Sequence, residues 1–225
     1  IKTDTREHYV IVKRFASFTS TKWLAASIFG IPATHIVMNP GQRLVNEYEF
    51  SLILKNLGLC VPKIYAVVLD SYMLMKEYME GKPLSKIVDD IIKDNYVRSI
   101  VFKLGTLLAR IHNNGIALGD SRLENFIVKD NEICIVDLEQ ARYGNIKDKA
   151  WDIAEIIYFL ALEKQFKNPS IVIECAKILA SGYVSGGGDL SILKEATKPR
   201  YLAPFIGFIN PQLAKNISNA LRFVE

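Results

Sequence analysis

The first eighty positions of the chain are rich in apolar runs with the composition of strands. His8 to Phe15 (HYVIVKRF), Val61 to Leu69 and Tyr72 to Met75 are β-branched, aromatic or otherwise apolar. Asp70-Ser71 separates the last two runs and is typical of a hairpin turn. Between the first run and this hairpin, Leu44 to Leu57 has apolar residues at helical spacing and ends before a glycine. The pattern predicts a small sheet with one helix.

Helical spacing dominates the rest of the chain. Glu77 to Pro83 (EYMEGKP) breaks the pattern as a linker would, and Leu84 to Ile92 then predicts a helix. The strongest amphipathic helix is predicted over Val97 to His112, where the apolar residues fall on one face. From Trp151 onward the pattern is mainly helical, with an interruption at Ser185 to Gly188.

These elements predict an α+β chain in two unequal lobes, a strand-rich lobe over residues 1–79 and a helical lobe over residues 80–225. With 50% hydrophobic and 23% charged residues, the composition indicates a globular protein. The apolar stretches are too short to cross a bilayer and no signal-peptide pattern is present, so we expect a cytoplasmic protein without membrane contact. Because the chain begins with Ile1, we expect that its natural start is missing.

Charge and cysteine content change this picture little. The net charge of +4 is a mild basic excess without a dense Lys/Arg block, so any nucleic-acid contact is expected to be indirect. Cys60, Cys134 and Cys175 are widely spaced and odd in number, which predicts neither a disulfide nor a zinc site. Cys134 lies in an apolar run and is interpreted as a small buried hydrophobe.

The segment that points to chemistry is Leu118 to Glu139 (LGDSRLENFIVKDNEICIVDLE). Asp120 and Asn125 stand at the spacing D-x-x-x-x-N, and two short apolar runs, expected to form a hairpin, then lead to Asp137. Because the hairpin fixes the distance between two hard oxygen ligands, Asn125 and Asp137 could hold Mg²⁺ against a polyphosphate. Asp120 is left free to orient a hydroxyl or a water molecule.

This segment resembles the protein-kinase-like superfamily, whose catalytic loop reads H-R-D-x-x-x-x-N and whose metal motif reads D-F-G. It is most similar to the small atypical members, such as the RIO-type kinases and the kinase subunit of the KEOPS tRNA-modification complex. The resemblance spans roughly Val10 to Ile157, and its most specific stretch runs from Gly105 to Asp120. It implies a two-lobed kinase fold that binds ATP and Mg²⁺.

The resemblance also implies roles for individual residues. Lys13 matches the lysine that contacts the α- and β-phosphates of ATP. Glu49 matches the helix glutamate that pairs with this lysine, and Glu47 is a close rival. Glu77 and Met79 would meet adenine through backbone groups in the hinge between the lobes.

Further matches lie around the catalytic loop. Arg122 stands where kinases often place a cation that neutralises the transferred phosphoryl group, although a solvated loop arginine is an equal alternative. Asp152 resembles the buried aspartate that anchors this loop. His112 is interpreted as a hydrogen-bonded core histidine.

The chain departs from the kinase pattern at several positions. Leu118 replaces the usual histidine, and Asp137-Leu138-Glu139 replaces D-F-G, so that Glu139 could touch a metal or pair with Arg142. Residues 1–12 contain no glycine, which puts a glycine-rich phosphate lid before Ile1 or excludes it. The short segment between Glu139 and Asp152 lacks the A-P-E motif of conventional protein kinases.

Three functions are compatible with this sequence. The first is an ATP- and Mg²⁺-dependent phosphotransferase, acting on a protein serine or threonine, on itself or on a small molecule. The second is an ATPase subunit of a larger complex, such as a tRNA-modification assembly, with protein partners. The third is a pseudokinase that binds partners without catalysis.

Overall fold

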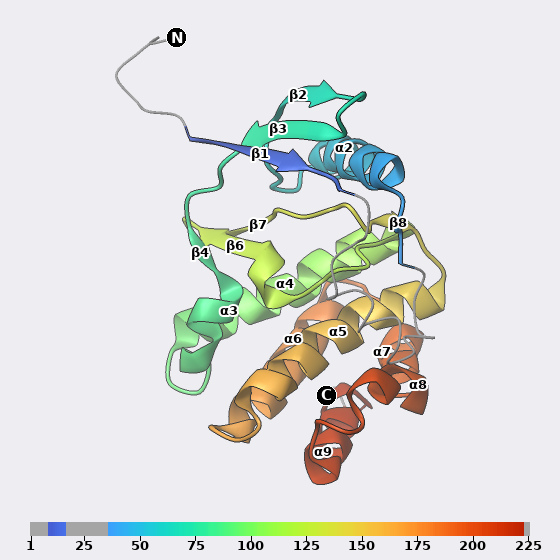
Figure 1. Cartoon of the computed structure of the whole chain (residues 1–225). Coiled ribbons are helices and arrows are strands. Elements are labelled where there is room, and N and C mark those ends of the chain that lie inside the picture. The colour runs from blue at the N-terminus through green and yellow to red at the C-terminus, as the bar shows by residue number, and fades with distance from the viewer. Residues whose placement is uncertain (1–8, 17–35, 223–225) are drawn as a thin grey trace.

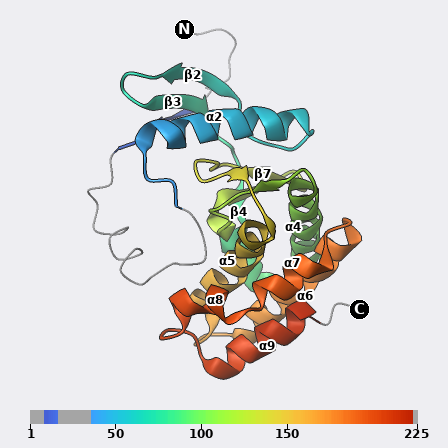
Figure 2. The ribbon, with the colours of Figure 1, turned by 90° about the vertical axis from the view of Figure 1, so that its right-hand side faces the viewer.

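The computed structural model describes residues 9–16 and 36–222 and has a two-lobed α+β fold. Figures 1 and 2 show a small lobe of strands and helix α2 stacked on a larger, helical lobe. The predicted fold class is thereby confirmed. Residues 1–8, which precede β1 and lack glycine, lie outside the described residues. In the described part of the chain, none of the helices has the length and apolar character that crossing a bilayer requires.

In its described residues, the small lobe consists of a three-stranded antiparallel sheet covered by one long helix. Its elements are β1 (Val10–Arg14), α2 (Pro40–Asn56), β2 (Ile64–Val68) and β3 (Met73–Glu77), with the strands in the order β1-β3-β2. The helix begins at Asn39, whose side chain accepts a backbone N–H and so caps the first turn. Phe15, Leu44 and Leu74 are buried between helix and sheet. Strand β2 is shorter than predicted because Pro62 offers no N–H to the ladder.

A second antiparallel sheet lies between the small lobe and the helices (Figure 1). It consists of β4 (Lys82–Pro83), β6 (Phe126–Lys129) and β7 (Glu132–Ile135), in the order β4-β6-β7. The tight hairpin predicted over Lys129 to Glu132 is confirmed, since Asp130 and Asn131 both have positive φ, as a type I′ turn requires. The predicted linker after β3 contains β4, which fixes it to the large lobe. We propose that the boundary between the lobes lies between residues 79 and 80.

The large lobe is mainly helical, as predicted. Its helices are α3 (Leu84–Ile87), η1 (Val88–Asp90), α4 (Asn95–Asn113), η2 (Leu123–Asn125), α5 (Ile146–Lys164), α6 (Pro169–Ser185), α7 (Leu190–Ala196), α8 (Pro199–Leu202), η3 (Ala203–Phe205) and α9 (Pro211–Arg222). Two short strands, β5 (Ile116–Ala117) and β8 (Arg142–Tyr143), pair with each other. The apolar face of α4 is buried, with Ile100, Leu104 and Leu108 fully covered. The central helices α4, α5 and α6 therefore supply much of the core on which the segment 118–139 rests.

Cys60 and Cys134 form a disulfide, so the prediction of no disulfide was wrong. The two residues are 74 positions apart in the sequence, yet their Cα atoms lie 4.5 Å apart. Residues after α2 run alongside β7, where the Ile135 N–H donates to the Cys60 carbonyl at 2.9 Å. Only this long-range pairing brings the two thiols together. Cys134 is buried, as predicted, and Cys175 is a buried free thiol.

Candidate functional site

The loop of residues 118–125 is anchored by a buried aspartate of α5. Asp152 accepts hydrogen bonds from the backbone N–H groups of Leu118 (2.7 Å) and Gly119 (2.8 Å). It also lies 3.2 Å from Nε2 of His112, which is buried. The structure therefore places Asp152 under the loop and His112 in the core, where the sequence analysis expected them. Leu118 is itself buried and packs in the core in place of the histidine.

Glu155, one helical turn after Asp152, also holds this loop and was missed in the sequence. Its Oε2 accepts from the Ser121 N–H at 2.7 Å and from the Ser121 Oγ–H at 3.1 Å. Burial and the nearby carboxylates of Asp120 and Asp152 raise the pKa of Glu155, although the hydrogen bonds from Ser121 oppose that shift. The i, i+3 spacing from Asp152 on a buried helix face was a signal that could have found it.

Asp120 and Arg122 form a bidentate ion pair. Arg122 Nε and Nη2 donate to the two carboxylate oxygens of Asp120 at 2.7 and 3.0 Å. Arg122 also contacts Glu124 at 3.1 Å, and its guanidinium lies 5.6 Å from the ring centroid of Phe159. The hydrogen bond to Asp120 raises the pKa of Arg122 further above its ordinary value. In this arrangement the guanidinium of Arg122 covers the carboxylate of Asp120.

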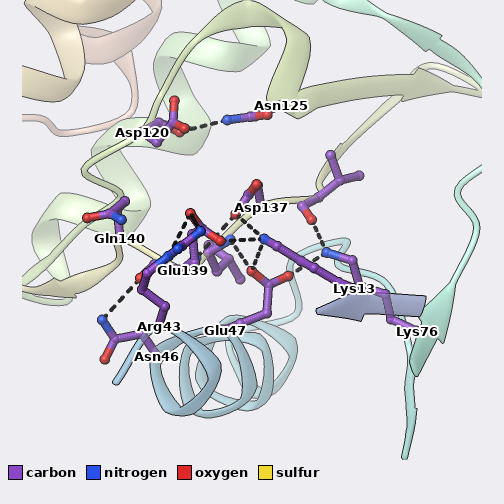
Figure 3. Close-up of polar contacts among 12 residues, drawn as sticks. Lys13, Arg43, Asn46, Glu47, Lys76, Asp120, Asn125, Asp137, Glu139 and Gln140 are labelled. Carbon is purple, nitrogen blue, oxygen red and sulfur yellow. Dashed lines mark hydrogen bonds and ion pairs between the residues drawn. The ribbon is translucent and has the colours of Figure 1, made fainter. Parts of the chain in front are cut away.

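Asn125 connects the loop to the strand end that carries Asp137. Its side-chain nitrogen donates to the backbone carbonyl of Asp120 at 3.1 Å (Figure 3). The backbone carbonyl of Asn125 accepts the Val136 N–H at 3.0 Å. Among the described residues, no hydrogen bond uses the side-chain oxygen of Asn125. This oxygen could therefore accept a further contact, since the amide nitrogen already has a partner.

Lys13 lies at the centre of a cluster of three carboxylates (Figure 3). Its Nζ is 2.9 Å from Asp137, 2.8 Å from Glu139 and 3.3 Å from Glu47. Burial works against the charged form of Lys13, but the three carboxylates outweigh it and raise the pKa of Lys13. Burial likewise opposes ionisation of Asp137, yet Lys13, and to a smaller extent Lys76, hold its pKa below the ordinary value. Both charges are present at neutral pH.

The glutamate that pairs with Lys13 is Glu47, not the preferred candidate Glu49. Glu47 is buried on the inner face of α2, where its Oε2 also accepts the Leu138 N–H at 3.0 Å. Glu49 is exposed to solvent. Two residues along a helix turn the side chain by about 200°, so only one of the two glutamates can face the sheet. The sequence spacing from the strand left this register open, and packing of α2 decided it.

Lys76 and Arg43 complete the cluster and were not singled out in the sequence. Lys76, only 5% exposed, donates to Glu47 Oε1 and to the Val136 carbonyl. A signal was present, because Lys76 stands two positions after Leu74 in a strand and therefore faces the same side as this core residue. Arg43, one helical turn before Glu47, lies on the same face of α2.

Glu139 does not pair with Arg142, one of the two contacts that the sequence left open for it. Arg43 Nε and Nη2 donate to Glu139 Oε1 at 3.1 and 2.6 Å, and Asn46 Nδ2 donates to the Glu139 carbonyl at 3.2 Å. Arg142 pairs instead with Asp148, at 2.8 Å. The carboxylate that replaces the glycine of D-F-G thus ties the end of this motif to α2.

A cleft of about 390 Å³ is lined by four of these side chains together with the segment after β3. Its lining includes Lys13, Lys76, Glu77, Met79, Asn125 and Asp137. Exposed Glu49 is not part of it, and neither are Asp120 and Arg122, which lie beside it on the loop. The Glu77 N–H donates to the Lys63 carbonyl at 2.8 Å, whereas within residues 9–16 and 36–222 the Met79 backbone makes no hydrogen bond.

The donor set of the cleft fits a hard divalent cation. Mg²⁺ prefers oxygen ligands, usually one or two carboxylates completed by phosphate and water. Asp137 supplies an ionised carboxylate and Asn125 an amide oxygen, and both line the same cleft. These two residues could therefore hold Mg²⁺, with Lys13 beside Asp137 as a cationic group for phosphate.

Residues 34–173 match the family described as "Lipopolysaccharide core biosynthesis protein (WaaY)". The chain belongs to this family. The match covers more than half of the chain and includes Glu47, Lys76, Asp120, Asn125 and Asp137, but not Lys13. The kinase-like relatives described next place the chain in the protein-kinase-like superfamily, as the sequence motifs indicated.

Curated relatives include two proteins of tRNA modification complexes or pathways and one protein kinase, by their descriptions. A probable bifunctional tRNA threonylcarbamoyladenosine biosynthesis protein of Methanocaldococcus jannaschii is 30% identical over 112 residues, 49% of this chain and 20% of the relative. The KEOPS complex subunit Bud32 of Pyrococcus abyssi is 22% identical over 46% of this chain and 47% of the relative. Protein kinase kin1 of Schizosaccharomyces pombe is 25% identical over 76% of this chain and 19% of the relative. The chain thus spans about a fifth of the length of the first relative and about half that of Bud32.

Proposed function

We propose that this protein is an ATP- and Mg²⁺-dependent phosphotransferase of the small atypical kinase type. The observation that carries the proposal is that one cleft is lined by Lys13, the segment from Glu77 to Met79, Asn125 and Asp137. The same cleft thus holds a cation for phosphate, a backbone segment for the adenine base and two oxygen ligands for Mg²⁺. Membership of a kinase-like family supports the same reaction class.

Each group would have a defined task. Lys13 would hold the phosphates, with Glu47 fixing its ammonium group, and the backbone at Glu77 and Met79 would meet adenine. Asn125 and Asp137 would bind Mg²⁺, which supplies charge neutralisation for the transferred phosphoryl group. Positioning and charge account for most of the catalysis in this reaction class, so a rigid cluster of this kind is suited to it.

Asp120 would orient the acceptor hydroxyl, which requires Arg122 to leave at least one of its oxygens. Arg122 is a third exposed and directly precedes η2, so rotation of its side chain can release Asp120. The freed guanidinium could then contact the transferred phosphoryl group. Substrate binding would thus exchange an internal ion pair for one with phosphate, which a planar guanidinium binds in the same bidentate way.

The comparisons suggest three candidate acceptors for the phosphoryl group and do not select one of them. The family description names lipopolysaccharide core biosynthesis, where the acceptor would be a sugar hydroxyl. The tRNA-modification relatives favour an ATPase subunit of an assembly with protein partners, where the acceptor would be water. A protein serine or threonine is the third acceptor, by analogy with protein kinase kin1.

The test is release or transfer of the label from γ-³²P-ATP with Mg²⁺, using the chain and its Asp137→Ala and Asp120→Ala variants. We expect each variant to lower turnover by at least about 100-fold, because each removes a group that acts on the reacting phosphate. Asp70→Ala, which removes an exposed carboxylate in the β2–β3 turn, is the matched control and should keep full turnover.

The distribution of the label distinguishes the alternatives. Label on protein indicates a protein kinase, label on added lipopolysaccharide core sugar indicates a sugar kinase, and free phosphate indicates an ATPase. A chain that binds MgATP without turnover would instead be a pseudokinase. A chain that does not bind MgATP at all would contradict the proposed function.

A further inference from the structure

Lys76 is a buried cation that the proposed kinase chemistry does not use. It stands on β3, is only 5% exposed and lines the cleft together with Lys13 and Asp137. Its ammonium group donates to Glu47 Oε1 on α2 and to the carbonyl of Val136, the residue before Asp137 (Figure 3). One side chain of the small lobe thus holds both a helix of its own lobe and a strand end of the large lobe.

A buried lysine at this position carries a desolvation cost that an apolar side chain would not. Its neighbours on the strand, Met73, Leu74 and Met75, are apolar, and Leu74 on the same face is fully buried. Burying an ion pair costs desolvation, and replacing such a pair by apolar residues of similar volume is often neutral or stabilising. Stability alone therefore gives little reason for a charge here, whereas orientation of its partners does.

The partners of Lys76 are groups that define the site. The two carboxylate oxygens of Glu47 have different partners. Oε1 accepts from Lys76, whereas Oε2 accepts from Lys13 and from the Leu138 N–H. Removing Lys76 frees Oε1 to rotate toward Lys13 and leaves the Val136 carbonyl without its side-chain donor. Both changes alter the position of Lys13 relative to Asp137, although neither removes Lys13, Asn125 or Asp137 itself.

We propose that Lys76 is a positioning residue of the phosphotransferase site. It orients Glu47 and the segment Val136–Asp137, and so fixes the position of Lys13 relative to Asp137. The proposal rests on the proposed function and assigns the second lysine of the cleft a task within it. Lys13 holds phosphate and Lys76 holds the groups around Lys13. The two lysines are therefore expected to differ in kinetic effect.

The test is a double-mutant cycle of Lys76→Met and Glu47→Gln, read as kcat and KM for ATP in the Mg²⁺-dependent turnover assay. Methionine retains most of the lysine volume and removes the charge. We expect Lys76→Met to lower kcat by about 10-fold or more and to change KM for ATP by less than about 3-fold. Adding Lys76→Met to Glu47→Gln should lower kcat by no more than about a further 3-fold, because both act through one carboxylate.

Lys55→Met is the matched control, since Lys55 is exposed at the end of α2, away from the cleft, and should behave as wild type. If Lys76→Met alone does not fold, Lys76→Arg is measured in its place: it keeps the buried charge but changes the geometry of the contacts with Glu47 and the Val136 carbonyl, and it should lower kcat while leaving KM for ATP within about 3-fold of wild type.

Each other outcome overturns a defined claim. Wild-type kcat in Lys76→Met, multiplicative losses in the double variant, or a rise in KM alone would each overturn the positioning role while the phosphotransferase function stands. Absence of MgATP binding and turnover in the wild type would overturn the proposed function and this proposal with it.

Discussion

At the scale of single residues, Glu155 is a buried carboxyl whose ionisation opposes folding. Burial and the carboxylates of Asp120 and Asp152 raise its pKa in the folded chain above the value in the unfolded chain. The unfolded chain therefore loses this proton at a lower pH than the folded chain does. The contribution of Glu155 to stability is complete below its unfolded pKa and is lost as pH rises toward the folded pKa.

We predict that Glu155→Gln stabilises the protein at neutral and mildly alkaline pH. Glutamine keeps an oxygen that accepts from the Ser121 N–H and Oγ–H, and it cannot ionise. Thermal melts of wild type and variant at pH 4 and pH 8 check this: the Tm difference should favour the variant by a few degrees, about 3 °C, at pH 8 and vanish at pH 4. A Tm difference independent of pH would contradict the prediction.

At the scale of elements, α4 and α6 cross at an unusually close approach. A Cβ added at Gly105 would lie 2.2 Å from the Leu179 carbonyl oxygen, and one added at Gly182 would lie 2.1 Å from the Phe102 carbonyl oxygen. Real Cβ atoms do not approach so closely, so the two backbones meet only because glycine stands at both positions. The helix pair is thereby brought together more tightly than larger side chains permit.

We predict that Gly105→Ala destabilises the protein by about 1–3 kcal/mol, because the added methyl group forces the two helices apart. The sign is informative, since alanine in an exposed helix position is favoured over glycine by up to about 1 kcal/mol. Denaturant unfolding of the variant measures the change. Gly207→Ala is the control: an added Cβ there meets no atom within 4 Å, and stability should stay near wild type.

At the scale of the whole molecule, the Cys60–Cys134 disulfide ties the connection after α2 to β7. Strand β7 leads directly to Asp137, and α2 carries Glu47, so the bond links the two elements that supply the carboxylates around Lys13. Cys175 does not compete for it, since burial raises the pKa of this thiol to about 12 and keeps it protonated.

We predict that reduction of this disulfide lowers stability by about 4 kcal/mol in the chain-entropy picture, since it closes a loop of 74 residues. Thermal melts with and without a dithiol reductant check the value. The Cys60→Ala/Cys134→Ala variant is the control and should melt at one temperature under both conditions. A wild-type Tm unchanged by complete reduction would show that the bond contributes no stability.

The sequence by itself determined the features that depend on neighbouring positions. The D-x-x-x-x-N spacing, the Asp130-Asn131 turn and the approach to Asp137 lie within about twenty residues, where turn chemistry and strand period leave few alternatives. The hydrophobic pattern likewise determined the α+β class and the amphipathic helix α4, because burial of one face follows directly from the helical period.

Tertiary structure alone decided the features that join distant segments. Glu47 rather than Glu49 faces Lys13 because the packing of Leu44 and Phe50 sets the rotation of α2. The pairing of Lys76 with Glu47 and that of Cys60 with Cys134 depend on how the strands and α2 stack, which no local pattern encodes. Which side chains of distant elements face each other depends on how the whole core packs. A pattern within one segment of the sequence does not specify it.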